Sequence, residues 1–391
     1  MSLVDPRQRA KELIEQAERA LSQGLQTGAV AFARQAVATA PDWRYAHVVL
    51  GQMLTFNHDY WHNAEQCQQL LRDGVLDEAI ASWHRAVSTG FEDDWTQLCY
   101  AHALTAKGQY KQAAVQLRRG IEYLIRAKRP DYVREHWAKG AATGPDFLII
   151  GATKCGTTSL YEYMCEHPQV LPAIWKEIEY FRFPERGVEW YLSHFPRVPD
   201  GGTRYLSGEA STCYMSIFDA KTAVRAQFPN TKLIALVRDP VGKAISHFHH
   251  DVKIGCEHRS YEQALTRELD VLEGIKQPLH DSEYYWKTER GYVWLGMYVY
   301  FLENWLTAFP REQLLVIPSE DLYGKPAETL TKVFQFLGLP DHRLAKYDVH
   351  LQGNYEKKAD DPMRERLKRF FAPHNERLEQ LLGRQLDWQK P

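Results

Sequence analysis

A short stretch near the middle of the chain, FLIIGATKCGTTSLYEYM (residues 147–164), constrains its fold more than any other. Four apolar residues, Phe147 to Ile150, predict a buried strand that ends at Gly151. A glycine-bounded loop then leads to Thr157, where apolar residues begin to recur at helical spacing. A strand, a tight loop and a helix N-terminus in this order form an anion cradle, because the first backbone N–H groups of a helix point toward it. The stretch therefore predicts an α/β protein that binds a phosphorylated nucleotide.

The composition allows two domains and limits the choice of partner. The chain has 391 residues and a net charge of −2, so no overall positive field favours nucleic acid or an anionic membrane. Its N-terminus lacks the apolar core of a signal peptide, and no run approaches the roughly 20 apolar residues of a membrane span. Six scattered cysteines, without a CxxC pair or a Cys/His cluster, are typical of reduced thiols. We therefore expect a soluble cytoplasmic protein without a metal site.

Residues 1–140 predict helices only, and they contain a repeated pattern. The segment GVLDEAIASWHRAV (residues 74–87) matches GQYKQAAVQLRRGI (residues 108–121) at an offset of 34 residues, and a weaker copy runs from Gly24 to Val37. The copies that begin at Gly24 and Gly74 lie further apart than those that begin at Gly74 and Gly108, so residues 57–73 are expected to be an insertion. This period resembles that of tetratricopeptide repeats, which usually form binding surfaces. We expect these repeats to bind a protein partner or a second copy of the chain.

The pattern then changes to alternating strands and helices. Apolar strands are predicted at residues 147–150, 232–237 and 314–318, and the last follows a helical run over residues 297–309. Strands that alternate with helices predict a parallel sheet flanked by helices.

We therefore divide the chain into a helical-repeat domain, residues 1–140, and an α/β domain, residues 145–391. The segment between them is rich in glycine and alanine and is typical of a linker. The charged tail, residues 361–388, is expected to be helical and broken near Pro373.

The loop of the first stretch is not a Walker motif. Gly151 and Gly156 have the separation of the GxxxxGK[ST] pattern, but Thr157 stands where that pattern requires lysine. Without the lysine, a nucleoside triphosphate is a poor ligand. Lys154 lies inside the loop instead, where its charge suits a shorter 5′ substituent with a leaving oxygen.

A second motif, LIALVRDPVGKAISHF (residues 233–248), predicts another phosphate site. Arg238 ends its strand 84 residues after Lys154, and Ser246 follows on the next helix. An arginine and a serine that converge beside the first loop can bind a separate phosphate, with the arginine as a bidentate fork. An ordinary ion pair would explain Arg238 alone, but the two motifs in this order favour the phosphate site.

Together the two motifs resemble the 5′-phosphosulfate and 3′-phosphate motifs of sulfotransferases that use 3′-phosphoadenosine-5′-phosphosulfate (PAPS). The heparan-sulfate-sulfotransferase-like branch and its bacterial members are the most similar. The likeness covers about residues 146–388, including WKEIEYF (175–181), GEAS (208–211), FPREQLL (309–315), EDL (320–322) and FFAPHNE (370–376). It implies the sulfotransferase fold, with a P-loop-like parallel sheet. It also implies metal-independent sulfuryl transfer from PAPS to a hydroxyl or amine, with 3′,5′-adenosine diphosphate (PAP) as product.

The resemblance also implies roles for single residues. Lys154 would stabilise the leaving oxygen, and Glu177, at the position of the family's catalytic glutamate, would take the proton of the acceptor. The first loop would hold the 5′-phosphate, and the second motif the 3′-phosphate, aided by a late loop that covers the cofactor. The implied cofactor-binding residues are Lys154, Cys155, Gly156, Thr157, Thr158, Ser159, Arg238, Ser246, Tyr355, Lys357 and Lys358.

On the acceptor side, Glu177 and Glu179 would face the same way if their segment is extended. A plain surface ion pair between Lys176 and Glu177 is the alternative. Many relatives carry histidine where Glu179 stands, and heparan-type enzymes carry lysine where Ala210 stands, so a polyanionic acceptor is disfavoured. The acceptor-binding candidates are Trp175, Glu179, Tyr180, Glu209, His249 and His250, and the acidic, aromatic character of this side also includes Trp190. His247, His249 and His250 are rival candidates for the base.

These features predict a small-metabolite acceptor, for which a cationic alkaloid of the saxitoxin type is one example. A neutral glycan or glycolipid is the alternative acceptor class. A nucleotide kinase, or a repeat scaffold with an inactive enzyme domain, remains a less favoured alternative for the whole chain.

Overall fold

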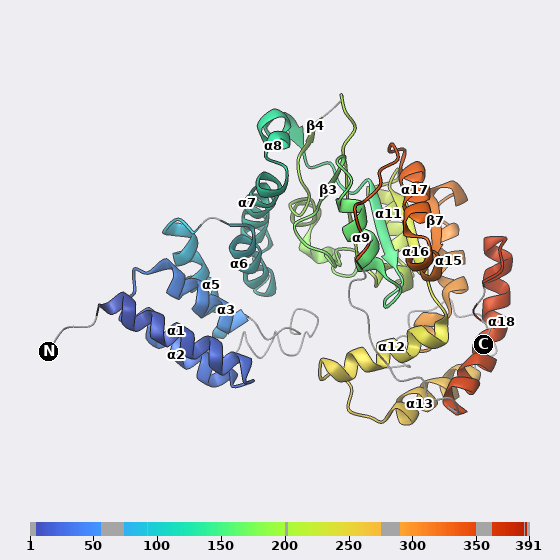
Figure 1. Cartoon of the computed structure of the whole chain (residues 1–391), viewed down its shortest axis with the longest axis horizontal. Coiled ribbons are helices and arrows are strands. Elements are labelled where there is room, and N and C mark those ends of the chain that lie inside the picture. Colours follow the sequence, from blue (N-terminus) through green and yellow to red (C-terminus); the bar gives the residue numbers. More distant parts are fainter. Residues whose placement is uncertain are drawn as a thin grey trace. The chain divides into compact units, whose positions relative to one another are not determined.

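The computed structural model describes residues 5–55, 74–91, 93–199, 202–274, 290–348, 362–386 and 388. Its chain divides into two compact units (Figure 1). The first, here called the helical unit, comprises Met1–Thr143 and Glu185–Asp200. The second, here called the sheet unit, comprises Gly144–Pro184 and Gly201–Pro391.

The helical unit begins with a stack of helices in which α1 packs on α2, α3 on α5, and α6 on α7. Their bounds are α1 Pro6–Ser22, α2 Gln26–Thr39, α3 Arg44–Thr55, α5 Val75–Ser88, α6 Asp94–Ala106, α7 Tyr110–Lys128, α8 Pro130–His136 and the 3-10 turn η1 Trp137–Lys139. The all-helical prediction for this region is confirmed. Among the helices of the described residues, none is long and apolar enough to cross a lipid bilayer.

The three expected repeat copies share one backbone feature. Gly24, Gly74 and Gly108 have φ values of 75°, 71° and 76°, and they precede α2, α5 and α7. Glycine adopts this left-handed conformation without steric cost, so the same turn recurs in each copy. That these helices are tetratricopeptide repeats stays a prediction, and the expected insertion at residues 57–73 lies outside the described residues.

A segment from beyond the expected domain boundary belongs to the helical unit. Helix α10 (Val188–Leu192) packs against α7, and β4 (Val198–Pro199) pairs antiparallel with β1 (Gly140–Ala141). The helical unit of the structure is therefore larger than residues 1–140.

Side chains secure this segment to three elements of the helical unit. The indole N–H of Trp190 donates to Thr105 Oγ1 of α6 at 2.9 Å, and the hydroxyl of Tyr132 on α8 donates to the carbonyl oxygen of Arg197 at 2.5 Å. An ion pair of 2.9 Å joins Glu189 to an arginine of α7. The ring of Trp190 is buried and belongs to the helical unit, so its expected part in the acceptor side stays a prediction.

His194 makes the stability of this segment depend on pH. Its ring is buried, its Nδ1 lies 3.0 Å from the carbonyl oxygen of Trp190, and burial lowers its pKa from 6.5 to about 4. The unfolded chain binds this proton near pH 6.5 but the folded chain only near pH 4. The free energy of unfolding should therefore fall as the pH drops through this range, by about 3 kcal/mol in all. Urea unfolding across this range should show the loss, and H194N should lack it. Identical pH profiles for both proteins would contradict the assignment.

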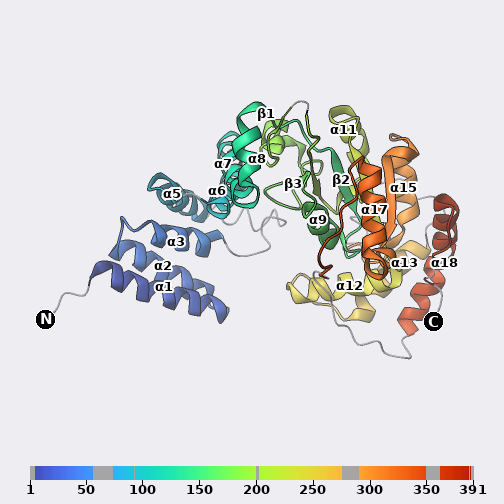
Figure 2. The same ribbon diagram turned by 45° about the horizontal axis from the view of Figure 1, so that its top comes forward.

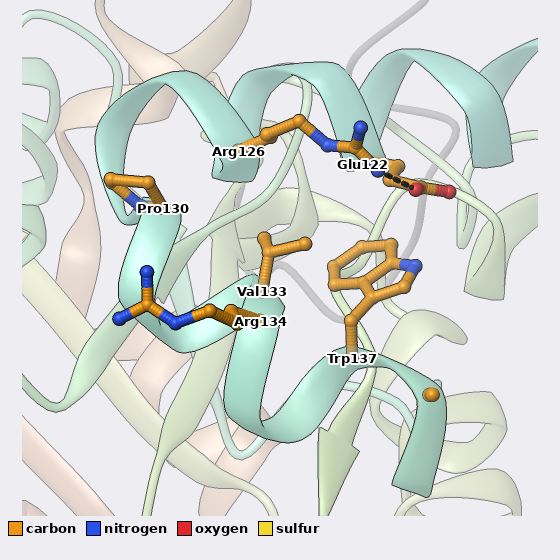
Figure 3. A pocket seen from close by; sticks show the side chains of 7 residues that line it. Glu122, Arg126, Pro130, Val133, Arg134 and Trp137 are labelled. Atoms are coloured by element: carbon orange, nitrogen blue, oxygen red, sulfur yellow. Dashed lines mark hydrogen bonds and ion pairs between the residues drawn. The ribbon is translucent and has the colours of Figure 1, made fainter.

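A hollow of about 390 Å³ lies in the helical unit between α7, α8 and η1 (Figure 3). Trp137 and Val133 line it, and Arg126 at its edge pairs with Glu122 at 2.6 Å. The other lining arginine, Arg134, also has a carboxylate partner one turn away on its own helix. None of the predicted site residues lines this hollow.

The sheet unit is built on a five-stranded parallel sheet with the order β3-β5-β2-β6-β7. The strands are β3 Val170–Pro172, β5 Leu206–Ala210, β2 Phe147–Gly151, β6 Lys232–Val237 and β7 Leu314–Pro318. Every residue of the central strand β2 is buried, as is usual for a parallel sheet covered on both faces. The predicted parallel α/β sheet is confirmed, and so are the three strands expected from the sequence.

Helices of the same unit surround the sheet (Figure 2). Their bounds are α9 Thr157–Cys165, α11 Ala220–Gln227, α12 Pro240–Lys253, α13 Tyr261–Glu273, α15 Tyr298–Leu306, α16 Ser319–Gly324, α17 Pro326–Leu337 and α18 Pro362–Leu382. The 3-10 turns are η2 Pro184–Arg186, η3 Tyr214–Ser216, η4 Trp294–Gly296 and η5 Arg311–Gln313.

Helix α18 continues through Pro373, so the expected break there is wrong. Phe371 and Leu378, on either side of the proline, are buried, and α18 packs against α12, α13 and α15. Burial of this apolar face outweighs the one backbone hydrogen bond that proline cannot donate.

Candidate active site

The first predicted loop lies between β2 and α9, at the carboxyl end of the central strand. Gly156 is the N-cap of α9 with a φ of 89°, and Lys154 has a φ of 64°. Thr157 and Ser159 are buried in the first helical turn, and Thr158 between them is half-buried. The backbone N–H groups of a first turn have no acceptor within their own helix, so this end of α9 suits an anion.

The second motif meets this loop at the same edge of the sheet. Arg238 follows β6, the neighbour of β2, and its Nη1 donates to the carbonyl oxygen of Lys154 at 3.4 Å. Asp239 caps α12 by accepting hydrogen bonds from the first-turn N–H groups. Ser246 is buried on this helix. The two motifs converge because the carboxyl ends of neighbouring parallel strands lie together, which is where such sheets bind ligands.

The electrostatics of this edge favour an anionic ligand. Burial lowers the pKa of Lys154, the charge of Asp251 raises it, and that of Arg238 lowers it again. Lys243 on α12 is fully buried, donates to the carbonyl oxygen of Tyr292 at 3.2 Å, and also has a pKa lowered by burial. An anion bound here would offset this cost, since an opposite charge favours the protonated form of each lysine. The residues present therefore fit a phosphorylated ligand.

Cys155 contributes to the loop through its backbone. Its thiol is buried, and burial raises its pKa to about 11, so it is no nucleophile at neutral pH. Its carbonyl oxygen accepts a hydrogen bond of 2.6 Å from Ser319 Oγ, which secures α16 to the loop.

Tyr323, one turn further along α16, is a candidate that sequence reasoning missed. A Cβ atom placed on Gly156 would lie only 2.6 Å from the Tyr323 hydroxyl, so this hydroxyl lies directly against the loop. It makes no hydrogen bond to another residue of the described chain, and its side chain is partly exposed. No motif marks this tyrosine; only the packing of α16 places it here.

Glu177 is held against the carboxyl end of β5. Its N–H donates to the carbonyl oxygen of Ala210 at 3.0 Å, and its Oε2 accepts from the N–H of Thr212 at 2.9 Å. Its Oε1 forms an ion pair with Lys176, so the ion pair that was the alternative to a base exists together with the backbone contacts. About a quarter of the Glu177 side chain (26%) is exposed, which leaves the carboxylate open to an acceptor.

The segment that carries Glu177 and Glu179 is not extended, so the expected common face is wrong. Their φ values are 62° and 56°, and together with Lys154 they are the non-glycine residues of positive φ in the described chain. The Glu179 carboxylate is buried and pairs with Arg182 at 3.2 Å. Hydrogen bonds to the end of β5 override the alternation of a strand here. Such strained residues cluster at functional sites.

The other acceptor candidates differ in how far they reach solvent. Trp175 is 40% exposed, whereas Tyr180 is buried and donates to Gln227 Oε1 at 3.0 Å. Glu209 is fully buried in β5, where the hydroxyls of two neighbouring side chains bind its carboxylate. Of these three, Trp175 alone is open to an acceptor in the structure.

The three histidines on α12 differ in the same way. Burial and the nearby lysine charges hold the pKa of His247 well below its usual range, so this ring is neutral near pH 7. His249 stacks on Tyr261 with centroids 6.5 Å apart, and His250 is exposed. Which of these rings meets the acceptor stays a prediction.

Three predicted cofactor-binding residues, Tyr355, Lys357 and Lys358, fall within residues 349–361, outside the described part of the chain.

A family model described as "Sulfotransferase domain" matches residues 144–376, more than half of the chain. The chain therefore belongs to the sulfotransferase family. The match begins where the sheet unit begins, and it spans both anion-binding motifs and the Glu177 segment.

Curated relatives extend this likeness. The chain is 32% identical over 219 residues to human bifunctional heparan sulfate N-deacetylase/N-sulfotransferase 3, covering 54% of this chain and 24% of the relative. It is 28% identical over 285 residues to human heparan sulfate glucosamine 3-O-sulfotransferase 3A1, covering 64% of each. The chain thus spans less than two thirds of either relative's length.

A solved structure resembles the same part of the chain. The sulfotransferase from Alicyclobacillus acidocaldarius is 28% identical with a TM-score of 0.50, and the match covers 63% of this chain and 99% of that one.

Proposed function

We propose that this protein transfers a sulfuryl group from PAPS to a hydroxyl or amine of a small acceptor, with Glu177 as base. The observation that carries the proposal is the convergence of three strand ends. Lys154 follows β2, Arg238 follows β6, and the contacts of Glu177 lie at the end of β5. These strands are neighbours in one parallel sheet, so an anion cradle and an open carboxylate share one edge.

The cofactor would be held at both of its phosphate ends. The first turn of α9, with Thr157, Thr158 and Ser159, supplies backbone and hydroxyl donors for the 5′-phosphate. Arg238 and Ser246 supply donors for the 3′-phosphate. The Tyr323 hydroxyl is a further donor beside Gly156. When bound, PAPS supplies the sulfuryl group and departs as PAP.

The residues divide the chemistry between them. Glu177 accepts the proton of the acceptor O–H or N–H as that atom bonds to sulfur, and Thr212 keeps the carboxylate oriented. Lys154 balances the charge that grows on the bridging phosphate oxygen as the S–O bond breaks. Such preorganised donors usually make the largest contribution to catalysis. We expect the reaction to need no metal ion.

Changing Lys154 to methionine should lower the turnover by about 10²–10³-fold, because the growing negative charge loses its cation. Affinity for PAP should fall less, since the N–H groups of α9 remain. Initial rates of transfer from sulfur-35-labelled PAPS, with calorimetric PAP titration, measure both effects. Lys253→Met is the control, because the charge of this exposed lysine also lowers the pKa of Lys154. Equal losses of turnover in both variants would mean that Lys154 contributes only to the general positive charge of the site.

A small cationic acceptor suits the partly exposed carboxylate of Glu177, whereas the Glu179 carboxylate is buried and paired with Arg182. The names of the relatives point to heparan sulfate, which supports the alternative of a glycan acceptor. Labelled PAPS offered to a panel of guanidinium and amine compounds, and separately to neutral glycans and heparan sulfate, distinguishes these classes.

Calorimetric titration with PAP, and separately with ATP plus Mg²⁺, tests the activity itself. Tight PAP binding with weak ATP binding supports the proposal. Tight ATP binding would favour the kinase alternative, and no nucleotide binding by folded protein would favour an inactive scaffold.

The proposed plan of the chain is a helical-repeat domain followed by a sulfotransferase domain, in the cytoplasm. The repeats are proposed to bind a protein partner or a second copy of the chain. The positive-φ glycine before each repeated helix supports the repeat assignment.

A further inference from the structure

Glu209 is a buried carboxylate that the proposed chemistry does not use. It lies in β5 opposite Leu148 of the central strand and is 0% exposed. Its Oε2 accepts a hydrogen bond of 2.5 Å from Ser211 Oγ, and its Oε1 accepts one of 2.8 Å from the Tyr214 hydroxyl. Each oxygen of this carboxylate therefore holds a different side chain in place.

Both of these side chains reach the loop that carries the proposed base. Ser211 Oγ also accepts a hydrogen bond of 3.0 Å from the N–H of Glu179. The ring of Tyr214 packs edge-on against Phe181, with centroids 5.2 Å apart and planes at 76°. Glu209 thus has one connection to each end of the turn that directly follows Glu177.

The loop of residues 177–181 needs the support of these two side chains. Glu177 and Glu179 both have a left-handed backbone, which costs free energy and persists only where the surroundings determine it fully. A buried hydrogen-bond network with its donors satisfied is rigid. A buried carboxylate with two hydroxyl donors supplies this rigidity.

We propose that Glu209 is a positioning residue, which acts through Ser211 and Tyr214 to hold residues 177–181 in the conformation that presents Glu177 to the acceptor. The inference rests on the proposed role of Glu177. Its closed surroundings favour this role for Glu209 over direct contact with the acceptor.

Hydrogen–deuterium exchange of the full chain tests this without knowledge of the acceptor. In Ser211→Ala and Glu209→Gln, the peptide of residues 176–183 should exchange about tenfold faster. The first variant removes the hydroxyl that accepts the N–H of Glu179, and the second removes the carboxylate that holds this hydroxyl in place. Ser211→Thr keeps the hydroxyl and should restore protection. Ser207→Ala is the matched control: Ser207 is a buried serine of the same strand, and its hydroxyl donates to Leu171 at 3.0 Å.

The outcomes separate this inference from the proposed function. Faster exchange confined to the loop, with PAP affinity within about twofold of wild type, supports positioning. Unchanged loop exchange overturns it, and so does faster exchange throughout the sheet unit that Ser207→Ala reproduces. A tenfold loss of PAP affinity would place Glu209 at the cofactor and would also overturn it. If wild-type protein binds no PAP, the proposed function fails, whereas the exchange result still decides the role of Glu209 in holding the loop.

Discussion

Replacing Glu177 with glutamine is expected to slow sulfuryl transfer by about 10²–10⁴-fold while PAP binds with nearly unchanged affinity. Glutamine has the shape of glutamate, and its oxygen can still accept the N–H of Thr212, so the loop should keep its position. It cannot take the proton of the acceptor, however, and turnover depends on that step. Transfer of label from PAPS and calorimetric PAP titration measure the two quantities.

Lys176→Met is the matched control for this prediction. It breaks the ion pair with Glu177 but leaves the carboxylate and its contact with Thr212 in place. A base predicts a large loss in Glu177→Gln and a small one in Lys176→Met. A surface ion pair predicts the same small loss in both, and that result would refute the assignment of Glu177 as base.

The parts of the fold that the sequence predicted are those with strong local signals. The strands at residues 147–150, 232–237 and 314–318 are apolar runs in the sheet, and a run of this kind is recognisable without its neighbours. Strand β5, with the sequence LSGEA, is also fully buried, but its serine, glycine and glutamate hide it from a search for apolar residues. Its polar residues can be buried because each has a partner: Ser207 donates to Leu171 of the neighbouring strand β3, and Glu209 accepts from Ser211 and Tyr214 just after β5.

The candidate site likewise has a part that the sequence predicted and a part that it did not. Arg238 and Lys154 meet because neighbouring parallel strands end together, which the order of motifs already implied. The left-handed turn at Glu177 and Glu179 depends on hydrogen bonds to Ala210 and Ser211, residues more than 30 positions away. The conformational propensities of residues 177–179 do not reveal such long-range contacts.

The position of Trp190 depends on an even more distant partner. A buried tryptophan beside the acceptor loop in sequence is expected to belong to the same domain. The structure instead packs it on a helix that lies 85 positions earlier in the chain. Sequence proximity therefore does not determine which of two units a segment joins.

Removal of residues 1–140 is expected to leave a fragment that does not persist as a soluble, folded monomer. Trp190, Tyr191 and Phe195 are buried in the helical unit of the full chain, and the deletion exposes them. Leaving a large apolar side chain exposed instead of buried costs about 1.5–3 kcal/mol, and a domain has only about 5–15 kcal/mol of stability in total. The segment Glu185–Asp200 also directly follows the Glu177 loop, so its release should disturb the acceptor side.

Size-exclusion chromatography and thermal unfolding of the fragment measure this effect, and the control is a shorter deletion. Removal of residues 1–43 takes away α1 and α2 but keeps Thr105, Tyr132 and the partner of Glu189, which hold the segment. The shorter deletion should therefore remain folded and bind PAP, whereas the longer one should aggregate. A monomeric 141–391 fragment with wild-type PAP affinity would show that the helical unit is a detachable module. Aggregation confined to the longer deletion would instead mean that the enzyme domain needs the helical unit to complete its fold, whatever else the repeats bind.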